Sequence, residues 1–130
     1  MSVKFRAGVI GRTGRGDYGH LLDTVYADTP NVDCVAVADD DEQGLKLAGE
    51  RLGLKALYSD YREMLDQEKL DIVSVAPRWA DCHCDMVIAC AEAGVKGIFC
   101  EKPMAKTLSE ADAMLQSCQR NNVKVAVAHR

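Results

Sequence analysis

A run of glycines near the N-terminus could bind a phosphate group. Residues 11–20 read Gly-Arg-Thr-Gly-Arg-Gly-Asp-Tyr-Gly-His and directly follow an apolar, β-rich segment. Glycine lets amide groups approach a ligand closely, so this turn, together with the start of a following helix, can face the pyrophosphate of a dinucleotide. The loop is longer than the usual G-x-G-x-x-G motif, and the part played by each glycine stays open. We predict that its cofactor-binding residues are Gly11, Arg12, Thr13, Gly14, Gly16 and Gly19.

An acidic residue at the expected distance supports a dinucleotide site. Asp39 follows the apolar segment 32–38 and lies 20 positions beyond Gly19, close to the usual spacing of about 20. Its carboxylate can accept hydrogen bonds from the adenosine ribose and would repel a 2′-phosphate, and Asp40 stands where an arginine would be needed. The sequence therefore predicts NAD rather than NADP. The alternative is that Asp39 belongs to a solvated acidic turn that caps the next helix.

The elements that would position these residues alternate between strands and helices. Apolar, β-rich segments predict strands at 3–10, 32–38, 56–58, 70–76, 96–100 and 123–128. Apolar residues at helical spacing predict helices at 21–26, 45–52, 61–67, 84–91 and 108–118. We expect Gly94 to end one helix, and a capping box from Thr107 to Glu110 to begin the last. Strict alternation predicts an α/β, doubly wound parallel sheet of about six strands, the Rossmann fold, in one domain covering residues 1–130.

Composition narrows the partners and the compartment. A net charge of −4 gives no general attraction to nucleic acid or to a membrane surface. No stretch reaches the roughly 18 apolar residues of a membrane span, and no signal segment is evident, so we expect a cytoplasmic protein. The six cysteines lie mostly in apolar periodic segments and are expected to be reduced and mostly buried. Cys82-His83-Cys84 with Cys90 lacks the paired spacing of zinc sites, so no metal site is expected.

Several motifs together resemble those of the Gfo/Idh/MocA oxidoreductases, which include glucose-fructose oxidoreductase and inositol dehydrogenases. The most specific is Glu101-Lys102-Pro103, directly after the fifth predicted strand. Further matches are AGVIG at 7–11, VAVADD at 35–40, YSDY at 58–61, LDIVSVAP at 70–77, His83, and Ala93-Gly94. The resemblance covers the whole chain, although the glycine loop and the stretch between Pro77 and His83 are longer than the family's usual pattern.

The resemblance implies roles for the residues around the fifth predicted strand. Lys102 would be the catalytic residue, close to the nicotinamide, where its ammonium orients the substrate hydroxyl and assists proton transfer. Its position supports this independently, because ligands bind outside the carboxyl ends of parallel strands; the alternative is an exposed surface lysine. Glu101 would hold Lys102 by charge or bind the cofactor ribose. A cis peptide bond between Lys102 and Pro103 is also implied.

Three residues after the fourth predicted strand are further candidates for cofactor contact. Pro77 ends the strand and lies on the segment expected to face the dinucleotide. Trp79 could wall the nicotinamide pocket, although it could equally pack in the core or beneath another domain. His83 could contact the cofactor or serve a structural role at the start of a helix.

The resemblance implies an NAD-dependent dehydrogenase whose substrate is a small carbohydrate or polyol, oxidised at a sugar, polyol or inositol carbinol. The family's second domain supplies the substrate pocket. We therefore expect a cofactor domain of a longer, homo-oligomeric protein, lacking the C-terminal substrate domain and inactive on its own. One alternative is a non-catalytic, dinucleotide-sensing regulator of the same fold. Another is a methyl-donor-binding domain, which would give no reason for the Glu101-Lys102-Pro103 motif.

Overall fold

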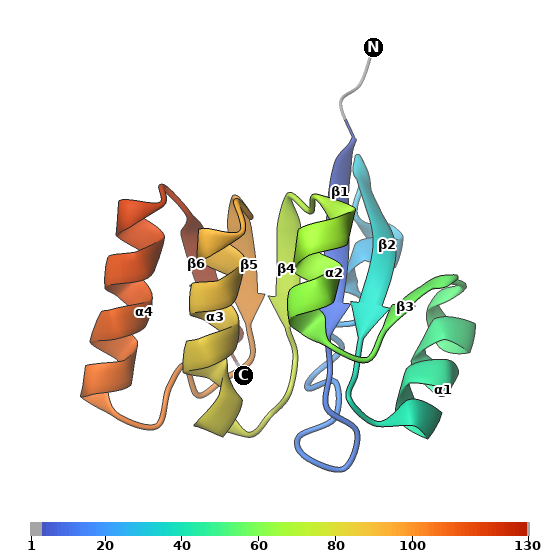
Figure 1. Cartoon of the computed structure of the whole chain (residues 1–130), viewed down its shortest axis with the longest axis horizontal. Coiled ribbons are helices and arrows are strands. Elements are labelled where there is room, and N and C mark those ends of the chain that lie inside the picture. Colours follow the sequence, from blue (N-terminus) through green and yellow to red (C-terminus); the bar gives the residue numbers. More distant parts are fainter. Residues whose placement is uncertain (1–3, 130) are drawn as a thin grey trace.

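Six parallel strands form the sheet that organises the chain (Figure 1). The computed structural model describes residues 4–129. The strands are β1 (Phe5–Ile10), β2 (Val32–Ala38), β3 (Ala56–Tyr58), β4 (Ile72–Val75), β5 (Gly97–Cys100) and β6 (Lys124–Val127). Their order is β3-β2-β1-β4-β5-β6, so the winding direction reverses at β1. The predicted doubly wound fold is confirmed, while the predicted strand start at Val3 lies outside the described residues.

Four of the predicted helices are confirmed. They are α1 (Glu42–Leu52), α2 (Tyr61–Glu68), α3 (His83–Glu92) and α4 (Leu108–Arg120), with a short 3₁₀ turn, η2 (Ala80–Cys82), before α3. Thr107 caps α4 as predicted, because its hydroxyl accepts a hydrogen bond from the amide of Glu110 at 3.0 Å. The carboxylate of Glu110 reaches back to the amide of Lys106 at 3.0 Å rather than to that of Thr107, so the capping box is shifted by one residue. Gly94 adopts a φ of 91° just beyond the end of α3. Such a left-handed residue is a frequent way to end a helix.

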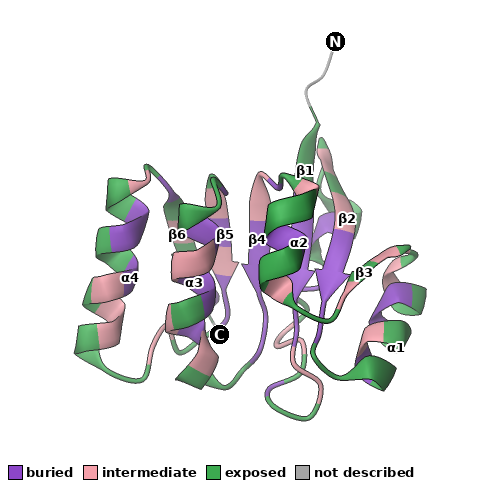
Figure 2. Cartoon of the chain, viewed as in Figure 1, coloured by how far each residue is buried: buried purple, intermediate pink, exposed green. Residues whose placement is uncertain are grey.

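Two apolar clusters bury the two faces of the sheet, as the buried residues in Figure 2 indicate. The larger cluster lies beneath α2, α3 and α4 and includes the fully buried Met64, Val87 and Met114. The smaller lies beneath α1 and the segment that follows the glycine loop, and includes Leu22 and Ala48. Because both faces are covered, the strands carry nearly continuous apolar residues.

The predicted helix at 21–26 is wrong. This segment forms turns that lead into one 3₁₀ turn, η1 (Val25–Asp28). Asp17, Gly19 and Leu21 have φ values of 51°, 63° and 66°, and residues in the left-handed region cannot belong to a right-handed helix. Within the described residues no α-helix follows the glycine loop directly, so the expectation that a helix N-terminus faces the pyrophosphate is wrong as well.

All six cysteines carry free thiols. Cys90, Cys100 and Cys118 are buried in the larger cluster, and the other three are partly buried. Burial raises the pKa of Cys100 to about 12, which leaves an inert thiol. In the part of the chain that the structure describes, no group of three or more His, Cys, Asp or Glu side chains could hold a metal ion.

Between residues 4 and 129, none of the helices combines the length and the apolar character needed to cross a bilayer.

Candidate functional site

The predicted site residues gather at the carboxyl ends of four strands. β1 pairs with β2 on one side and with β4 on the other, so its carboxyl end is where the winding direction changes. Ligands of open α/β sheets bind in the crevice outside this point. The glycine loop follows β1, Asp39 follows β2, Pro77 follows β4 and Glu101 follows β5. The topology therefore brings these four segments to one edge of the sheet.

The glycine loop, residues 11–20, is a compact hairpin. The amide of Arg12 donates to the carbonyl of Asp17 at 3.1 Å, and the amide of Asp17 donates back at 2.9 Å. Gly14 and Gly16 lie between them with φ values of 81° and 98°, a conformation that costs little only for glycine. Gly11 lies against the ring of Tyr18, where a Cβ atom would be 2.2 Å from the ring carbons. The residues between Arg12 and Asp17, which lengthen this loop, thus fold back on themselves.

Two glycines dock this hairpin on the neighbouring strand ends. A Cβ atom on Gly16 would be 2.5 Å from the amide nitrogen of Arg78, which donates to the carbonyl of Gly16 at 2.9 Å. A Cβ atom on Gly19 would be 2.4 Å from the carbonyl oxygen of Ala76 and 2.2 Å from the carboxylate of Glu101. Both positions require glycine because the main chain approaches other segments there.

Asp39 is 2% exposed, and its carboxylate is engaged by donors from the protein. Thr13 donates from its hydroxyl at 2.6 Å and from its amide at 3.2 Å, and the Tyr18 hydroxyl donates at 2.8 Å. Burial, followed by the charge of Asp39, raises the pKa of Tyr18 and keeps its hydroxyl a donor. Asp41, whose carboxylate accepts from the amide of Gly44 at 2.8 Å, is the residue that caps α1.

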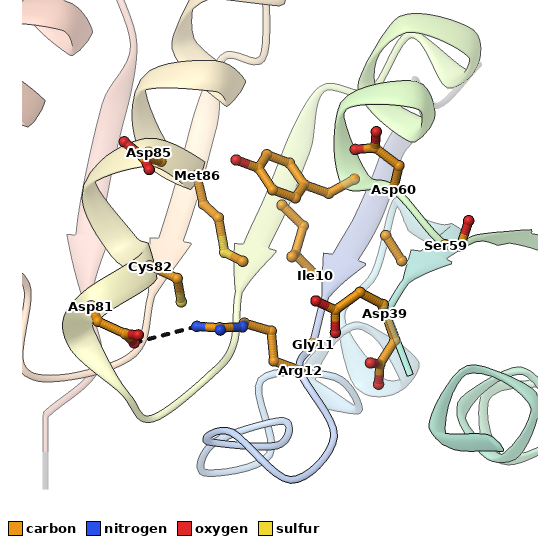
Figure 3. A pocket seen from close by; sticks show the side chains of 13 residues that line it. Ile10, Gly11, Arg12, Asp39, Ser59, Asp60, Asp81, Cys82, Asp85 and Met86 are labelled. Carbon is orange, nitrogen blue, oxygen red and sulfur yellow. Dashed lines mark hydrogen bonds and ion pairs between the residues drawn. The ribbon is translucent and has the colours of Figure 1, made fainter. Parts of the chain in front are cut away.

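A pocket of about 510 Å³ opens beside Asp39 between the ends of β1 and β2 and the starts of α2 and α3 (Figure 3). Of the predicted site residues, Gly11, Arg12 and Asp39 line it. Apolar side chains contributed by Ile10, Ala38 and Met86 form part of its wall. The volume lies within the range of ordinary ligand pockets.

The rim of this pocket is acidic. Its carboxylates belong to Asp39, Asp40, Asp60, Asp81 and Asp85. Two arginines of the hairpin reach these groups: the guanidinium of Arg12 lies 3.3 Å from Asp81, shown as the dashed line in Figure 3, and Arg15 pairs with Asp40. Carboxylates still outnumber arginines, so the rim of the pocket carries a net negative charge.

Glu101 is fully buried and ties the hairpin to the end of β5. Its carboxylate accepts hydrogen bonds from the amide of His20 at 2.5 Å, from Nδ1 of His20 at 2.9 Å and from the amide of Lys102 at 3.0 Å. Burial alone would raise the pKa of Glu101, but the hydrogen bonds from His20 and Lys102 outweigh it, and the pKa lies below its ordinary value. Glu101 is therefore an ionised anchor for two main-chain segments.

Lys102 lies directly beyond this anchor. Its side chain is exposed, and its peptide bond to Pro103 is cis, which confirms the expectation drawn from the resemblance. The carboxylate of Glu101 accepts a hydrogen bond from the main-chain amide of Lys102, so it fixes the position of the lysine main chain at the end of β5. The ammonium remains accessible to a ligand.

His83 and Trp79 have contrasting environments. The imidazole of His83 is buried between main-chain carbonyls: Nε2 lies 2.5 Å from the oxygen of Pro77, and Nδ1 lies 2.9 Å from that of Pro103. The ring joins the loops after β4 and β5, which favours its structural role over cofactor contact. Trp79 is 52% exposed, which leaves its indole free to cover a ligand or another domain.

Sequence reasoning missed several residues that build this site. Tyr18 and His20 stand inside the glycine loop, yet no spacing rule assigns them to the carboxylates that they reach. Ser59, Asp60 and Asp85 line the pocket. The first two belong to the motif at 58–61 that carries part of the family resemblance, and this was the only signal for them.

Comparison with known proteins agrees with this arrangement. Residues 5–129 match the model of an oxidoreductase family, GFO_IDH_MocA, described as having an NAD-binding Rossmann fold. A D-apiose dehydrogenase of Paraburkholderia graminis is 37% identical over 124 residues, which cover 95% of this chain and 32% of that protein. A myo-inositol 2-dehydrogenase of Thermotoga maritima is 34% identical over 88 residues, 68% of this chain and 26% of that protein.

A solved structure has the same fold. An oxidoreductase from Agrobacterium radiobacter, in complex with NAD+, L-tartaric acid and magnesium, superposes with a TM-score of 0.83 at 26% identity and covers 96% of this chain and 35% of that one. The chain thus spans about a third of the length of the proteins that it matches.

Proposed function

Since the chain belongs to the Gfo/Idh/MocA oxidoreductase family, we propose that it is the NAD(H)-binding part of a dehydrogenase acting on a sugar, polyol or inositol carbinol. The proposal rests on one observation: the glycine hairpin, the acidic pocket and Lys102 are arranged around the crevice at the carboxyl end of β1. The substrate class follows from relatives named for D-apiose and myo-inositol.

The residues of the crevice fit a dinucleotide. The apolar side chains of Ile10, Ala38 and Met86 offer a surface for an adenine ring, and the rim carboxylates offer acceptors for ribose hydroxyls. The pyrophosphate would then lie along the glycine hairpin. We place the nicotinamide toward Pro77, Trp79 and Lys102, because these residues follow the strands on the other side of β1.

The bound cofactor would supply the carbon that accepts or returns a hydride. Lys102 would donate a hydrogen bond to the substrate hydroxyl and help to move its proton. Glu101 would keep the main chain of Lys102 in place through the 3.0 Å hydrogen bond. Trp79, exposed next to this region, would help to exclude water once a ligand is bound.

We also propose that NAD(H) is preferred over NADP(H). The pocket rim carries five carboxylates, and two arginines, Arg12 and Arg15, offset part of this charge. An added 2′-phosphate would bring roughly two further negative charges to this surface, so its binding is opposed by electrostatic repulsion.

A direct titration tests the proposal. Fluorescence titrations of the 130-residue chain should give saturable binding of NADH, weaker binding of NADPH and no binding of S-adenosylmethionine. Tight binding of S-adenosylmethionine, or the absence of binding by either nicotinamide cofactor, would refute it.

The catalytic part of the proposal has its own test in the longer protein. Lys102→Met should lower kcat strongly with sugar or inositol substrates and leave the affinity for NADH within about twofold, because the lysine acts on the substrate. Unchanged kcat would refute the catalytic role of Lys102, whereas the absence of turnover by the unaltered longer protein would favour the dinucleotide-sensing regulator.

A further inference from the structure

We propose that His20 is a positioning residue for Lys102, which acts through the carboxylate of Glu101 and makes the hold on the lysine main chain depend on pH. The inference rests on the proposed dehydrogenase function, in which Lys102 acts on the substrate hydroxyl. It extends that function to a histidine at the end of the glycine hairpin, to which no motif assigned a role.

One buried carboxylate connects His20 with Lys102. Oε2 of Glu101 lies 2.9 Å from Nδ1 of His20 and accepts from the main-chain amide of His20 at 2.5 Å. Oε1 accepts from the amide of Lys102 at 3.0 Å. In the part of the chain that the structure describes, the imidazole of His20 is the one side chain that bonds this carboxylate. Hydrogen bonds that share a buried group polarise one another, so a change at Oε2 alters the bond at Oε1.

The carboxylate also fixes which nitrogen of the imidazole carries a hydrogen. Burial opposes the charge of Glu101, but its hydrogen bonds outweigh burial and hold its pKa below the ordinary value, so the ionised group can only accept. Nδ1 of His20 must therefore donate, and the neutral ring carries its lone pair on Nε2. Nε2 has no hydrogen-bond partner among residues 4–129, and the side chain is 30% exposed. Water can therefore protonate Nε2 while the bond from Nδ1 to Glu101 stays in place.

The other ionisable groups near His20 are few. From the neighbouring elements they are Glu101 and Lys102 after β5 and His129 after β6; His129 is exposed and lines the same hollow of about 600 Å³ as His20. The remaining charged side chains of the hairpin and of the segment after it pair elsewhere: Arg12 with Asp81, Arg15 with Asp40, Asp17 with Arg78, and Asp23 with Arg51. The imidazole of His20 thus has Glu101 as its one carboxylate partner.

This arrangement makes the hydrogen bond to Lys102 respond to pH. Histidine is the side chain that ordinarily changes charge between about pH 5 and 8, a range in which Glu101 stays ionised. When Nε2 gains a proton, the bond from Nδ1 becomes charge-assisted and strengthens. It draws electron density toward Oε2, so the bond from the amide of Lys102 to Oε1 weakens. The main chain of the lysine is therefore held most firmly when His20 is neutral.

Amide titration of the ¹⁵N-labelled 130-residue chain tests this coupling. As the pH falls from about 8 to 5, the Lys102 amide resonance should move upfield with the same midpoint as the ring protons of His20. His20→Asn keeps an N–H donor close to the position of Nδ1 but cannot change charge, so the Lys102 resonance should stop moving. His129→Gln is the matched control, because it removes the other histidine of the hollow and should leave the Lys102 titration unchanged. A Lys102 amide that does not titrate in the unaltered chain, or that still titrates in His20→Asn, would overturn the inference.

Turnover by the longer protein tests the consequence for the lysine. His20→Ala should lower kcat about tenfold and leave KM for NAD+ within about twofold, because a small displacement of Lys102 affects the chemical step. His20→Asn should recover most of kcat at the alkaline end of the range and lose the fall of kcat between about pH 8 and 5. Circular dichroism identifies a variant that fails to fold, in which case His20→Asn decides. Full recovery with an unaltered pH profile would mean that His20 is only structural and would overturn the inference. If the unaltered longer protein has no turnover, the proposed function fails instead, and the amide titration still decides the coupling.

Discussion

The two ends of the crevice are built differently. At the β2 end, Asp39 is surrounded by donors from the hairpin, and an acidic pocket with an apolar wall lies beside it. At the β5 end, buried Glu101 and His83 bond the main chain of the loops, while Lys102 and Trp79 remain exposed. The first end thus has a pocket formed by this chain, whereas at the second end the side chains of Lys102 and Trp79 are exposed.

The largest effect expected from this difference concerns turnover. We predict that the 130-residue chain binds NADH but does not oxidise sugars or inositols. Hydride transfer requires a positioned carbinol carbon, and a misplacement of about 1 Å can cost on the order of a hundredfold in rate. Sensitive assays of NADH formation with a panel of sugars and inositols provide the measurement. Saturable activity from the purified chain would show that the β5 end is complete as it stands.

The next largest effect should come from the anchor at the β5 end. Glu101→Gln should lower the free energy of unfolding by about 3 kcal/mol, because a buried charged acceptor with hydrogen bonds from His20 and Lys102 is lost. Urea denaturation followed by circular dichroism measures the loss. A change below about 0.5 kcal/mol would mean that this buried carboxylate does not anchor the loops.

The same variant gives a pH prediction. The pKa of Glu101 is lower in the folded chain than its ordinary value of 4.5. At pH values between the lowered pKa and 4.5, the unfolded chain therefore binds more protons than the folded chain. The stabilisation from Glu101 is therefore fully present above pH 4.5 and is lost as the pH falls through the lowered value. The difference in unfolding free energy between wild type and Glu101→Gln should shrink below pH 4.5; a constant difference would contradict the assignment.

The sequence predicted the positions of the strands better than the conformation of the glycine loop. Apolar periodicity located six strands and four helices, because a parallel sheet covered on both faces requires apolar strands. At 21–26 the spacing identified buried side chains, Leu22 and Tyr26, but not the turns that carry them. The left-handed conformations at Asp17 and Leu21 depend on how the hairpin docks, and residue type alone does not reveal it.

The site was predictable to a similar extent. Motif and spacing placed the glycine loop and Asp39 at the crevice, and the family resemblance placed Glu101 there. The donors that engage the two carboxylates were not, since Tyr18 and His20 reach them through tertiary folding. Motif spacing therefore located the charged groups and left their partners undetermined.

A smaller effect is the difference in stability between two alanine variants in the glycine hairpin. Gly16 contacts a neighbouring segment, whereas Gly14 only needs a positive φ. In Gly16→Ala the new Cβ would be 2.5 Å from the amide nitrogen of Arg78, which should cost about 3 kcal/mol in unfolding free energy and weaken NADH binding. Gly14→Ala is the matched control, because its φ is also positive but no atom lies within 4 Å of the new Cβ. It should cost only about 1 kcal/mol. Equal losses in thermal unfolding would show that docking of the hairpin contributes nothing.

The smallest expected effect on stability concerns the cap of α1, the helix that follows β2. Asp41→Ala removes the side chain that accepts from the amide of Gly44, and should lower the unfolding free energy by about 1 kcal/mol. Affinity for NADH should be unchanged, because the amide of Asp41 still bonds Asp39. Urea titration and a cofactor titration on one preparation measure both quantities. A loss of affinity without a loss of stability would instead place the Asp41 side chain at the ligand.

The proposed function requires that one dinucleotide spans the crevice from the acidic pocket to Lys102. Titration of the ¹⁵N-labelled chain with NADH, followed by amide chemical shifts, tests it most directly. Shifts should appear at both ends, at Gly11, Asp40 and Ser59 beside the pocket and at Lys102 beyond β5, with α4 unaffected. Shifts confined to one end, or the absence of any shift at saturating NADH, would contradict the claim.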